Sequence, residues 1–479
     1  MITSCKVIYS FRYNKKNYKG FIILVENFSQ LNLSKEFLLN LDSLNYSKPT
    51  AIQQKSLPLS LENHDLIAQA KTGSGKTVAF CIPLINKLDI KNFRVQSLII
   101  APTRELANQI AQELRKLSRH VHNLKVLTLC GGTPFKPQIL SLSHQAHILV
   151  GTPGRVLKHI SQNNIDLENI NSLVLDEADK MLDMGFYDDI MEIISSLPTK
   201  RQTLLFSATF EKNIEKLASN VLKNPVLVKI EDEEKVYIKQ KFYEVREDNK
   251  TALIPGIISS NKAKSILIFC NMKIKCDQLA DDLYALGLDV LTLHSDLEQK
   301  QRDETIILFS NKSYPILIAT DVASRGLHID DVDLVINYDL SLDEKVHTHR
   351  IGRTARAGKG GLAVSLYTHN DLDRYDIIKD TFPDIIEEDI SKIEDDLSYK
   401  IDSPQRTIFI NGGKKHKLRA GDILGALTAG IGLDKSDIGK IDILDFASYA
   451  AINKEKIAYV LEQLSKSKIK GKFYRIYEK

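Results

Sequence analysis

The sequence predicts two consecutive α/β domains with parallel sheets, followed by a small α+β domain. Three observations predict this arrangement. Short apolar runs rich in Val, Ile and Leu alternate with helix-length segments over most of the 479 residues, which is typical of βαβ units. An acidic stretch at residues 231–234 divides this alternation into two parts. After Pro404 the order becomes strand, helix, strand, strand, helix, strand, the ferredoxin-like plan of many RNA-recognition modules.

The first α/β domain is expected at residues 28–231. Its apolar runs are continuous, which indicates strands buried on both faces, and segments of crossover length, such as 103–118 and 211–222, separate them. The expected strands are 97–103, 125–130, 147–153, 172–179, 202–209 and 225–230.

The second α/β domain is expected at residues 232–372. Its expected strands are 240–245, 265–270, 289–295, 316–322, 334–339 and 361–367. A linker that includes a helix, residues 373–403, leads to an RNA-binding domain at residues 404–479. In this last domain the expected strands are 407–411, 440–444, 448–452 and 472–477, and the expected helices are 420–429 and 454–464.

Residues 1–27 are expected to form a disordered extension. The first 20 residues contain five basic residues and no acidic one, and no apolar core or small-residue cleavage site of a secretory signal follows them.

The composition points to a polyanion as partner of the C-terminal domain. Residues 404–479 carry 15 Lys and Arg against 8 Asp and Glu, whereas the rest of the chain carries 50 against 53. The five cysteines are scattered without a CxxC pair, which argues against a zinc site and fits a reducing cytosol. No apolar run approaches the roughly 18 residues of a membrane span. We therefore expect a cytoplasmic protein without a membrane partner.

The stretch AKTGSGKT, residues 70–77, is typical of a phosphate-binding loop between a strand and a helix. Its glycines allow backbone N–H groups to surround an anion, and the following helix adds its positive dipole end. The usual pattern has Gly where this chain has Ala70. The expected nucleotide-binding residues are Thr72, Gly73, Ser74, Gly75, Lys76 and Thr77, with Lys76 on the β/γ-phosphates and the Thr77 hydroxyl on Mg²⁺.

An acidic motif, Asp176-Glu177-Ala178-Asp179, follows a buried strand. Acids at the carboxyl end of such a strand lie where open α/β sheets bind their ligands. We expect Asp176 to bind Mg²⁺ and Glu177 to position and deprotonate the attacking water. Three acids in four residues are also typical of a solvated helix start, but the preceding strand and the upstream phosphate loop favour the catalytic interpretation.

From about Phe28 to Tyr367 the chain resembles the DEAD-box ATP-dependent RNA helicases, which consist of two RecA-like domains in tandem. The resemblance includes YSKPTAIQ, residues 46–53, which is similar to the adenine-reading Q motif of that family. It implies ATP as the nucleotide. Gln53 would pair with adenine, Tyr46 would offer an aromatic face, and Phe28 occupies the place of an isolated upstream aromatic residue.

Further motifs of the first domain resemble the RNA-backbone contacts of the family. They are PTREL (102–106), GG (131–132) and TPGR (152–155), and they imply RNA contacts by Arg104, Gly132, Thr152 and Arg155. Ser207-Ala208-Thr209 resembles the element that bonds the acidic motif, so Ser207, Thr209 and Asp179 are expected to couple hydrolysis to domain closure.

In the second domain HRIGRTAR, residues 349–356, resembles the motif that supplies arginine fingers, which implies that Arg353 and Arg356 neutralise the γ-phosphate. Arg302 and Thr320 match RNA contacts, and Gly326 matches a nucleotide contact. Two positions depart from the family pattern: Ser295 stands where Gly is usual, and His328 stands where Asp is usual. We expect weakened nucleotide affinity at most.

The region from Arg406 to Lys479 resembles the C-terminal domain of the DbpA subgroup of bacterial DEAD-box proteins. Three segments carry the resemblance: 410–428, 439–443 and 468–475. It implies binding to a hairpin of 23S ribosomal RNA in the precursor of the large ribosomal subunit, with Lys414, Lys415, Lys417, Arg419 and Lys470 as RNA contacts. Exposed rings on the central strands are not obvious, and Phe409 and Tyr449 are the nearest candidates for stacking on bases.

The expected function is therefore ATP-dependent remodelling of ribosomal RNA by a monomer that uses ATP and Mg²⁺. Two alternatives stay open: a general mRNA-remodelling helicase of the same family, and an ATP-gated RNA clamp or assembly scaffold. DNA translocation is disfavoured, because the chain has no strand-separating insertion and carries an RNA-type C-terminal domain.

Overall fold

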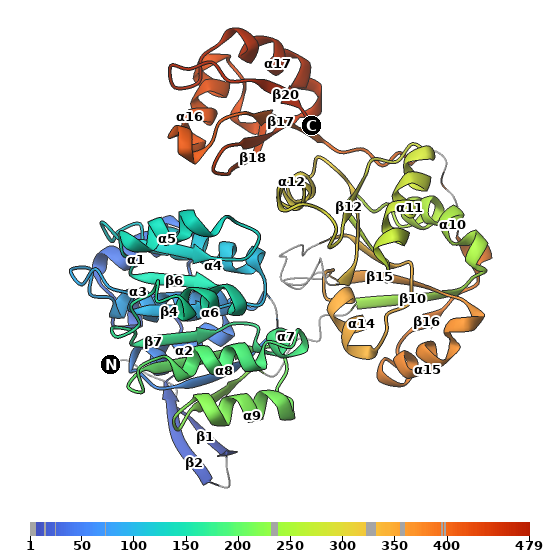
Figure 1. Ribbon diagram of the computed structural model, residues 1–479. Helices are drawn as coiled ribbons and strands as arrows, with labels where there is room; N and C mark the ends of the chain where they lie inside the picture. Colours follow the sequence, from blue (N-terminus) through green and yellow to red (C-terminus); the bar gives the residue numbers. More distant parts are fainter. Residues whose placement is uncertain are drawn as a thin grey trace. The chain divides into compact units, whose positions relative to one another are not determined.

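A computed structural model describes residues 6–13, 16–23, 25–71, 73–230, 238–321, 332–354, 360–393, 396 and 399–479, with side chains from residue 25 onward. The chain divides into two compact units, residues 1–233 and 234–479, close to the boundary predicted after residue 231. Each unit is described by itself below (Figure 1).

Unit 1 contains a parallel seven-stranded sheet with the order β5-β6-β4-β7-β8-β3-β9. All six predicted strands are present, and a seventh, β3, precedes the phosphate loop. The strands are β3 (Leu66–Gln69), β4 (Ser97–Ile100), β5 (Val126–Leu129), β6 (Ile148–Gly151), β7 (Ser172–Leu175), β8 (Gln202–Ser207) and β9 (Val226–Lys229).

Helices cover both faces of this sheet, which explains the continuous apolar runs of its strands. Successive side chains of a strand enter different cores: Leu98 and Ile100 pack into one, and Ile99 packs into the other. The helices are α1 (Lys35–Ser43), α2 (Ala51–Leu61), α3 (Lys76–Lys87), α4 (Arg104–Leu117), α5 (Phe135–Ser143), α6 (Pro153–Ser161), α7 (Ala178–Asp183), α8 (Tyr187–Ser195) and α9 (Lys212–Val221).

The prediction of a disordered N-terminal extension was wrong. The strands β1 (Lys6–Tyr13) and β2 (Lys16–Ile23) pair antiparallel, with Lys6 opposite Ile23 and Tyr13 opposite Lys16. Both segments are rich in β-branched and aromatic residues, which favour strands. The expectation of disorder gave weight to the five basic residues of this region and not to its strand-forming residues.

Unit 2 begins with a second parallel seven-stranded sheet, ordered β12-β13-β11-β14-β15-β10-β16. All six predicted strands are present. The strands are β10 (Ile238–Glu244), β11 (Ile266–Phe269), β12 (Val290–Leu293), β13 (Ile316–Ala319), β14 (Leu334–Asn337), β15 (Gly361–Tyr367) and β16 (Ile386–Glu387), and the helices are α10 (Lys250–Ser260), α11 (Lys273–Ala285), α12 (Gln299–Ser310), α14 (Glu344–Ile351) and α15 (Leu372–Thr381).

The predicted linker, residues 373–403, is in part a piece of this domain. Within it β16 pairs with β10, and the Tyr243 hydroxyl donates to Glu388 at 2.6 Å. In α15, Tyr375 and Ile378 are buried in an apolar cluster with Phe242. Acidic residues suggested a solvated linker, but here they accept hydrogen bonds at the sheet edge.

The C-terminal domain has the predicted ferredoxin-like order, an antiparallel sheet β18-β19-β17-β20. Its last strand begins later than predicted, because Lys470 and Gly471 have positive φ (50° and 77°) and form a tight turn between Ile469 and Lys472. The elements are β17 (Gln405–Ile410), β18 (Ile438–Ile443), β19 (Ser448–Asn453), β20 (Ile476–Glu478), α16 (Ala420–Gly425), a π-helical turn (Ala426–Gly430) and α17 (Ile457–Lys466).

The two central strands of this small sheet, β17 and β19, contact α12 of the same unit. Phe409 and Tyr449 are buried in a cluster with Ile307 and Ala447, and the Tyr449 hydroxyl lies 3.3 Å from Glu304 Oε2. These two rings, the nearest candidates for stacking on bases, are therefore covered, which agrees with the expectation that exposed rings are not obvious on the central strands. A ring on the surface of an isolated sheet and a ring in a domain contact have the same sequence pattern.

Polar contacts extend this junction. Thr407 Oγ1 lies 2.7 Å from both Asn311 Nδ2 and Ser313 Oγ, and all three side chains are buried. Within the described ranges, no helix combines the length and hydrophobicity needed to cross a bilayer.

Candidate ATP and RNA site

The phosphate loop lies between β3 and α3, as predicted. Gly73 and Gly75 have φ of 82° and 95°, in the left-handed region that favours glycine. Lys76 is buried, and its ammonium donates to the Ala70 carbonyl at 2.9 Å. A nucleotide phosphate would offer this ammonium a charged and therefore stronger acceptor. Ala70 is itself buried, with its N–H bonded to the Ser207 carbonyl of β8.

Gln53 lies against this loop. Its side chain is buried, Nε2 donates to the Gly75 carbonyl at 3.0 Å, and Oε1 accepts from the Thr50 N–H at 3.0 Å. A Cβ at Gly75 would lie 2.5 Å from Gln53 Nε2, so only glycine permits this contact. The predicted adenine-reading residue and the phosphate loop are thus in direct contact, while the adenine contact itself stays a prediction.

The two aromatic candidates occupy different environments. The Tyr46 hydroxyl donates to Glu113 Oε1 at 2.6 Å, and burial together with this carboxylate raises the tyrosine pKa. Phe28 is buried in the apolar core of unit 1. A role for either ring on adenine stays a prediction.

The acidic motif follows β7, two strands away from the phosphate loop strand. Asp176 and Glu177 are both buried, and Glu177 has φ of 49°. Asp179 Oδ2 accepts from the N–H groups of Ala208 and Thr209, at 3.0 and 3.1 Å. The predicted hydrogen bond between these two motifs is therefore present. Its role in coupling stays a prediction, and the Ser207 hydroxyl is buried without a partner among the described residues.

Glu177 has a cationic neighbour that the sequence did not indicate. Lys180 Nζ lies 2.8 Å from Glu177 Oε1, and both side chains are buried. Burial alone would raise the pKa of Glu177, but the charges of Lys180 and Lys76 outweigh burial and leave this pKa lowered. The other oxygen, Oε2, is buried with no hydrogen-bond partner in the described structure. One oxygen is thus held, and the second is available to accept a proton.

The predicted RNA contacts of unit 1 follow β4, β5 and β6, which are neighbours in the sheet. Arg104 begins α4, and Thr152 caps α6. Gly132 has φ of 67°, and a Cβ there would lie 2.0 Å from the Arg104 guanidinium. Arg155 donates to the Thr133 carbonyl at 3.1 Å. Residues from three separate motifs therefore share the carboxyl edge of the sheet.

Gln138 and His159 support this edge, and sequence motifs did not reveal them. Gln138 Oε1 accepts from Arg155 and lies 2.9 Å from His159 Nε2. Burial and the charges of Arg155 and Lys158 lower the pKa of His159 to about 4, so this ring is neutral at physiological pH. A neutral histidine adds no charge that would repel the arginine.

In unit 2 the buried residue Arg350 ties together several strand ends. Its guanidinium makes a bidentate ion pair with Asp321, at 2.7 Å for both contacts, and donates to Asn271 Oδ1 and the Asp339 carbonyl. These partners follow β13, β11 and β14. Because α14 ends at Ile351, Arg350 also fixes the helix that leads into Arg353. The sequence did not identify this residue as important.

The other predicted residues of unit 2 are placed only in part. Arg353 is buried, Thr320 is half-buried and donates its N–H to the Leu293 carbonyl, and Arg302 donates to the His294 carbonyl at 3.3 Å. The Ser295 hydroxyl contacts Asp296 at 3.4 Å. Four predicted positions lie outside the described residues: Thr72, Gly326, His328 and Arg356.

We predict that Lys180→Met slows the expected ATP hydrolysis about tenfold or more, with little change in KM for ATP. Removing this cation leaves the buried Glu177 carboxylate uncompensated, which costs about 3–5 kcal/mol. Steady-state kinetics and thermal unfolding measure the two effects. Lys180→Arg should retain most activity, and a Lys180→Met enzyme with unchanged kcat would refute this role.

We predict that Arg350→Lys lowers the unfolding free energy by about 2–4 kcal/mol, because lysine cannot make the bidentate pair with Asp321 or reach both other acceptors. ATP hydrolysis should fall with it. The matched control is Arg246→Lys, whose side chain is 81% exposed and paired with Asp248; its effect should stay within about 0.5 kcal/mol. Equal unfolding curves for both variants would contradict the prediction.

Comparison with known proteins agrees with this geometry. Three family models match the chain: DEAD/DEAH box helicase at residues 50–217, helicase conserved C-terminal domain at 249–358, and DbpA RNA binding domain at 407–478. A solved structure of S. cerevisiae Dbp5 bound to RNA and ADP BeF3 is similar, with a TM-score of 0.69 and 30% identity over 76% of this chain and 96% of that one.

The chain aligns with two curated relatives over almost their whole length. The ATP-dependent RNA helicase DbpA of Escherichia coli (strain K12) is 44% identical over 451 residues, which is 94% of this chain and 98% of the relative. The protein of the same name from Bacillus subtilis (strain 168) is 37% identical over 475 residues, 94% and 99% of the two chains. The chain therefore belongs to the DEAD-box ATP-dependent RNA helicases, within the DbpA subgroup.

Proposed function

We propose that this ATP-hydrolysing RNA helicase separates strands locally in 23S ribosomal RNA, and that a hairpin of that RNA in the large-subunit precursor is its docking site. The observation that carries the proposal is which surfaces of the C-terminal domain are covered and which expose cationic side chains. One face of its sheet is covered by α12, and a basic surface with an exposed ring lies elsewhere. A monomer acting in the cytoplasm, where ribosomal RNA is assembled, is part of this proposal.

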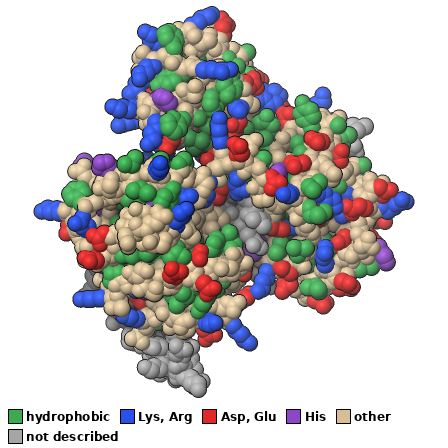
Figure 2. Space-filling view, in the orientation of Figure 1, with side chains coloured by type: hydrophobic (Ala, Val, Ile, Leu, Met, Phe, Trp, Pro, Cys, Tyr) green, Lys and Arg blue, Asp and Glu red, His purple; other side chains and the backbone are tan. Residues whose placement is uncertain are grey.

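We define the basic-aromatic face of the C-terminal domain as Lys414, Lys415, Lys417, Arg419 and Phe446. The four cationic residues are exposed, as predicted for RNA contacts, and Phe446 is 63% exposed. Figure 2 shows Lys and Arg side chains on the side of this domain where Figure 1 draws α16.

Backbone contacts hold this face in shape. The N–H groups of Lys414 and Lys415 donate to the carbonyls of Leu444 and Asp445, both at 2.9 Å. Lys470, also predicted as an RNA contact, donates to the Lys417 carbonyl and Asp422, at 2.7 and 2.9 Å, and its RNA contact stays a prediction. It therefore supports the loop.

This arrangement suits a hairpin loop better than a flat single strand. Cations bind the phosphates, and one exposed ring offers a platform for an unstacked base. Phe446 lies edge-to-face with His416, with ring centroids 6.2 Å apart.

In the ATP site, Lys76 would bind the β/γ-phosphates at the N-terminus of α3. Thr77 and Asp176 offer a hydroxyl and a carboxylate, the hard oxygen donors that Mg²⁺ prefers, so the residues fit this ion. When bound, Mg²⁺ neutralises phosphate charge. Glu177 would accept a proton from the attacking water at Oε2, while Lys180 holds Oε1.

Domain closure would complete the site. Arg353, and Arg356 by its resemblance, would approach the γ-phosphate only in the closed state, so binding of ATP and RNA together favours closure. Arg104, Thr152 and Arg155 would hold one RNA strand by its backbone in a bent path that excludes the pairing strand. Hydrolysis would then allow the domains to reopen.

We predict that a 23S fragment containing the docking hairpin stimulates ATP hydrolysis at least about tenfold more than unrelated RNA of equal length. Lys415→Glu with Arg419→Glu should abolish this difference, because the variant repels phosphate. The control Lys456→Glu, at the opposite end of β19, should retain it. Equal stimulation of the wild type by both RNAs would favour the general mRNA-remodelling helicase.

We predict that Glu177→Gln loses release of a short RNA duplex while ATP-dependent RNA binding persists. Glutamine keeps the size of the side chain but cannot accept the proton. Fluorescent duplex release and RNA anisotropy measure the two activities in parallel. If the wild type binds RNA in an ATP-dependent manner but releases no duplex, the clamp or scaffold alternative holds.

A further inference from the structure

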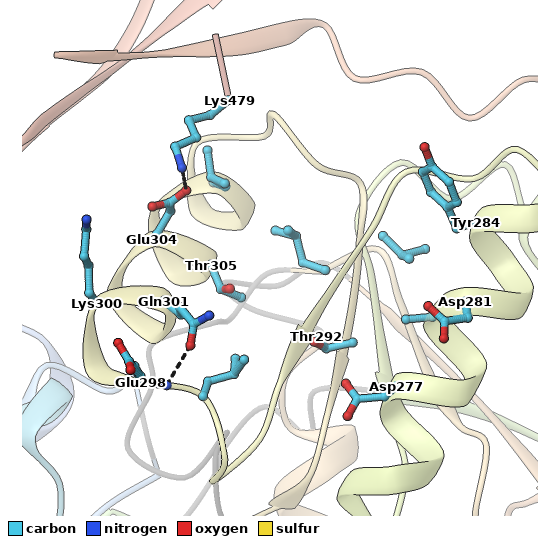
Figure 3. Close-up of a pocket in the computed structure, with 15 residues that line it drawn as sticks. Asp277, Asp281, Tyr284, Thr292, Glu298, Lys300, Gln301, Glu304, Thr305 and Lys479 are labelled. Carbon is cyan, nitrogen blue, oxygen red and sulfur yellow. Dashed lines mark hydrogen bonds and ion pairs between the residues drawn. The ribbon is translucent and has the colours of Figure 1, made fainter. Parts of the chain in front are cut away.

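The edge strand β12 of unit 2 borders an open slot. In the described part of the chain this strand pairs with β13 and with no strand on its other side. Helices α11 and α12 flank it and enclose a cavity of about 850 Å³ (Figure 3). Three of its four residues, Val290, Leu291 and Thr292, are partly exposed. The open edge of β12 therefore lies between two helices that line the same cavity.

An edge strand presents backbone N–H and C=O groups that a further strand can satisfy. Binding of an extended segment to such an edge is a recurring mode of peptide recognition, in which backbone hydrogen bonds give affinity and side-chain pockets give specificity. Leu291, Leu297 and Leu308 line this slot and can receive alternate apolar side chains.

The walls of the slot are acidic. Figure 3 shows Asp277 and Asp281 pointing from α11 toward β12, and Glu298 at the start of α12. The Asp277 carboxylate also contacts His294, with 2.9 Å between Oδ1 and the ring Nε2. The lining contains two lysines, Lys300 and Lys479, of which Lys479 is paired with Glu304, against four carboxylates. Carboxylates repel RNA phosphate, so the slot favours a cationic occupant that is not RNA.

Exposed apolar side chains lie at both ends of α11. Tyr284, at the rim, is 73% exposed, and Met272, Ile274 and Leu286 are also exposed at this helix or beside its ends. Tyr284 also lines the cavity, so its ring can contact an occupant of the slot.

We propose that this slot binds an extended lysine- or arginine-rich segment of a partner protein, with alternating apolar residues, as an additional strand beside β12. The acidic walls select the charge, the apolar floor receives every second side chain, and the open edge supplies the backbone hydrogen bonds. The proposal is independent of which RNA the helicase remodels. Because α12 also carries Arg302, the bound segment would lie beside the proposed RNA contacts.

The test uses fluorescence anisotropy with the full-length chain and a labelled synthetic peptide of about nine residues that alternates lysine and valine. The peptide should bind saturably, and Asp281→Lys should weaken binding about tenfold or more. The matched control is Asp282→Lys, an exposed position on the same helix that does not line the cavity; its affinity should stay within about twofold. A peptide with prolines in place of two valines should bind at least about tenfold more weakly, because proline removes strand hydrogen bonds.

Three results would overturn the proposal. Absence of saturable binding to the wild type would exclude the peptide, and equal losses in Asp281→Lys and Asp282→Lys would reduce the effect to overall charge. Undiminished binding of the proline peptide would exclude an added strand. Sedimentation velocity without peptide provides a further check, because a dimer that only Asp281→Lys dissociates would assign the slot to a second copy of the chain. RNA-stimulated ATP hydrolysis should be unchanged in both variants, which verifies their fold.

Discussion

Parallel strands buried on both faces constrain everything else in this helicase. In both units successive strand residues pack into opposite cores, so no face of either sheet is left for polar chemistry. Functional residues can lie only at strand ends, and in a parallel sheet the carboxyl ends share one edge. The phosphate loop after β3, the acids after β7 and the arginines after β4 and β6 are neighbours for this reason. They are far apart in sequence.

Buried charges at these edges are paired, which is the condition for keeping them ionised. Glu177 has Lys180, and Arg350 has Asp321 together with a guanidinium contact over the Phe269 ring, 5.1 Å from its centroid. The two ion pairs differ in which of their polar atoms have partners. Among the residues that the structure describes, the first leaves one carboxylate oxygen without a partner. The second engages the whole guanidinium and joins three strand ends. One is suited to accept a proton and the other to hold loops in place.

Helix α12 connects these edges to the C-terminal domain. Ile307 contacts Phe409 and Tyr449, and Glu304 contacts Tyr449 and Lys479. The RNA-recognition fold thereby loses the sheet face on which such modules commonly stack bases. Its basic-aromatic face is the proposed RNA surface, and α12 also lines the acidic slot, where Glu304 belongs both to the slot and to the domain contact. The proposed RNA surface and the proposed protein-binding slot are thus opposite in charge.

The sequence by itself determined the two parallel sheets, the ferredoxin-like domain and the ATP-site motifs, because hydrophobic period and short motifs are local properties. It led to a wrong expectation for residues 6–23, where basic charge obscured the strand preference, and it did not show that α12 covers Phe409 and Tyr449. Lys180, Gln138 and Phe446 lie outside the quoted motifs, and Arg350 lies within one that pointed only to Arg353 and Arg356. Their importance arises from partners distant in sequence or from exposure, as Arg350 with Asn271 and Asp321 illustrates. Only the tertiary structure decided which charges are paired and which rings are covered, because burial depends on what packs against a residue.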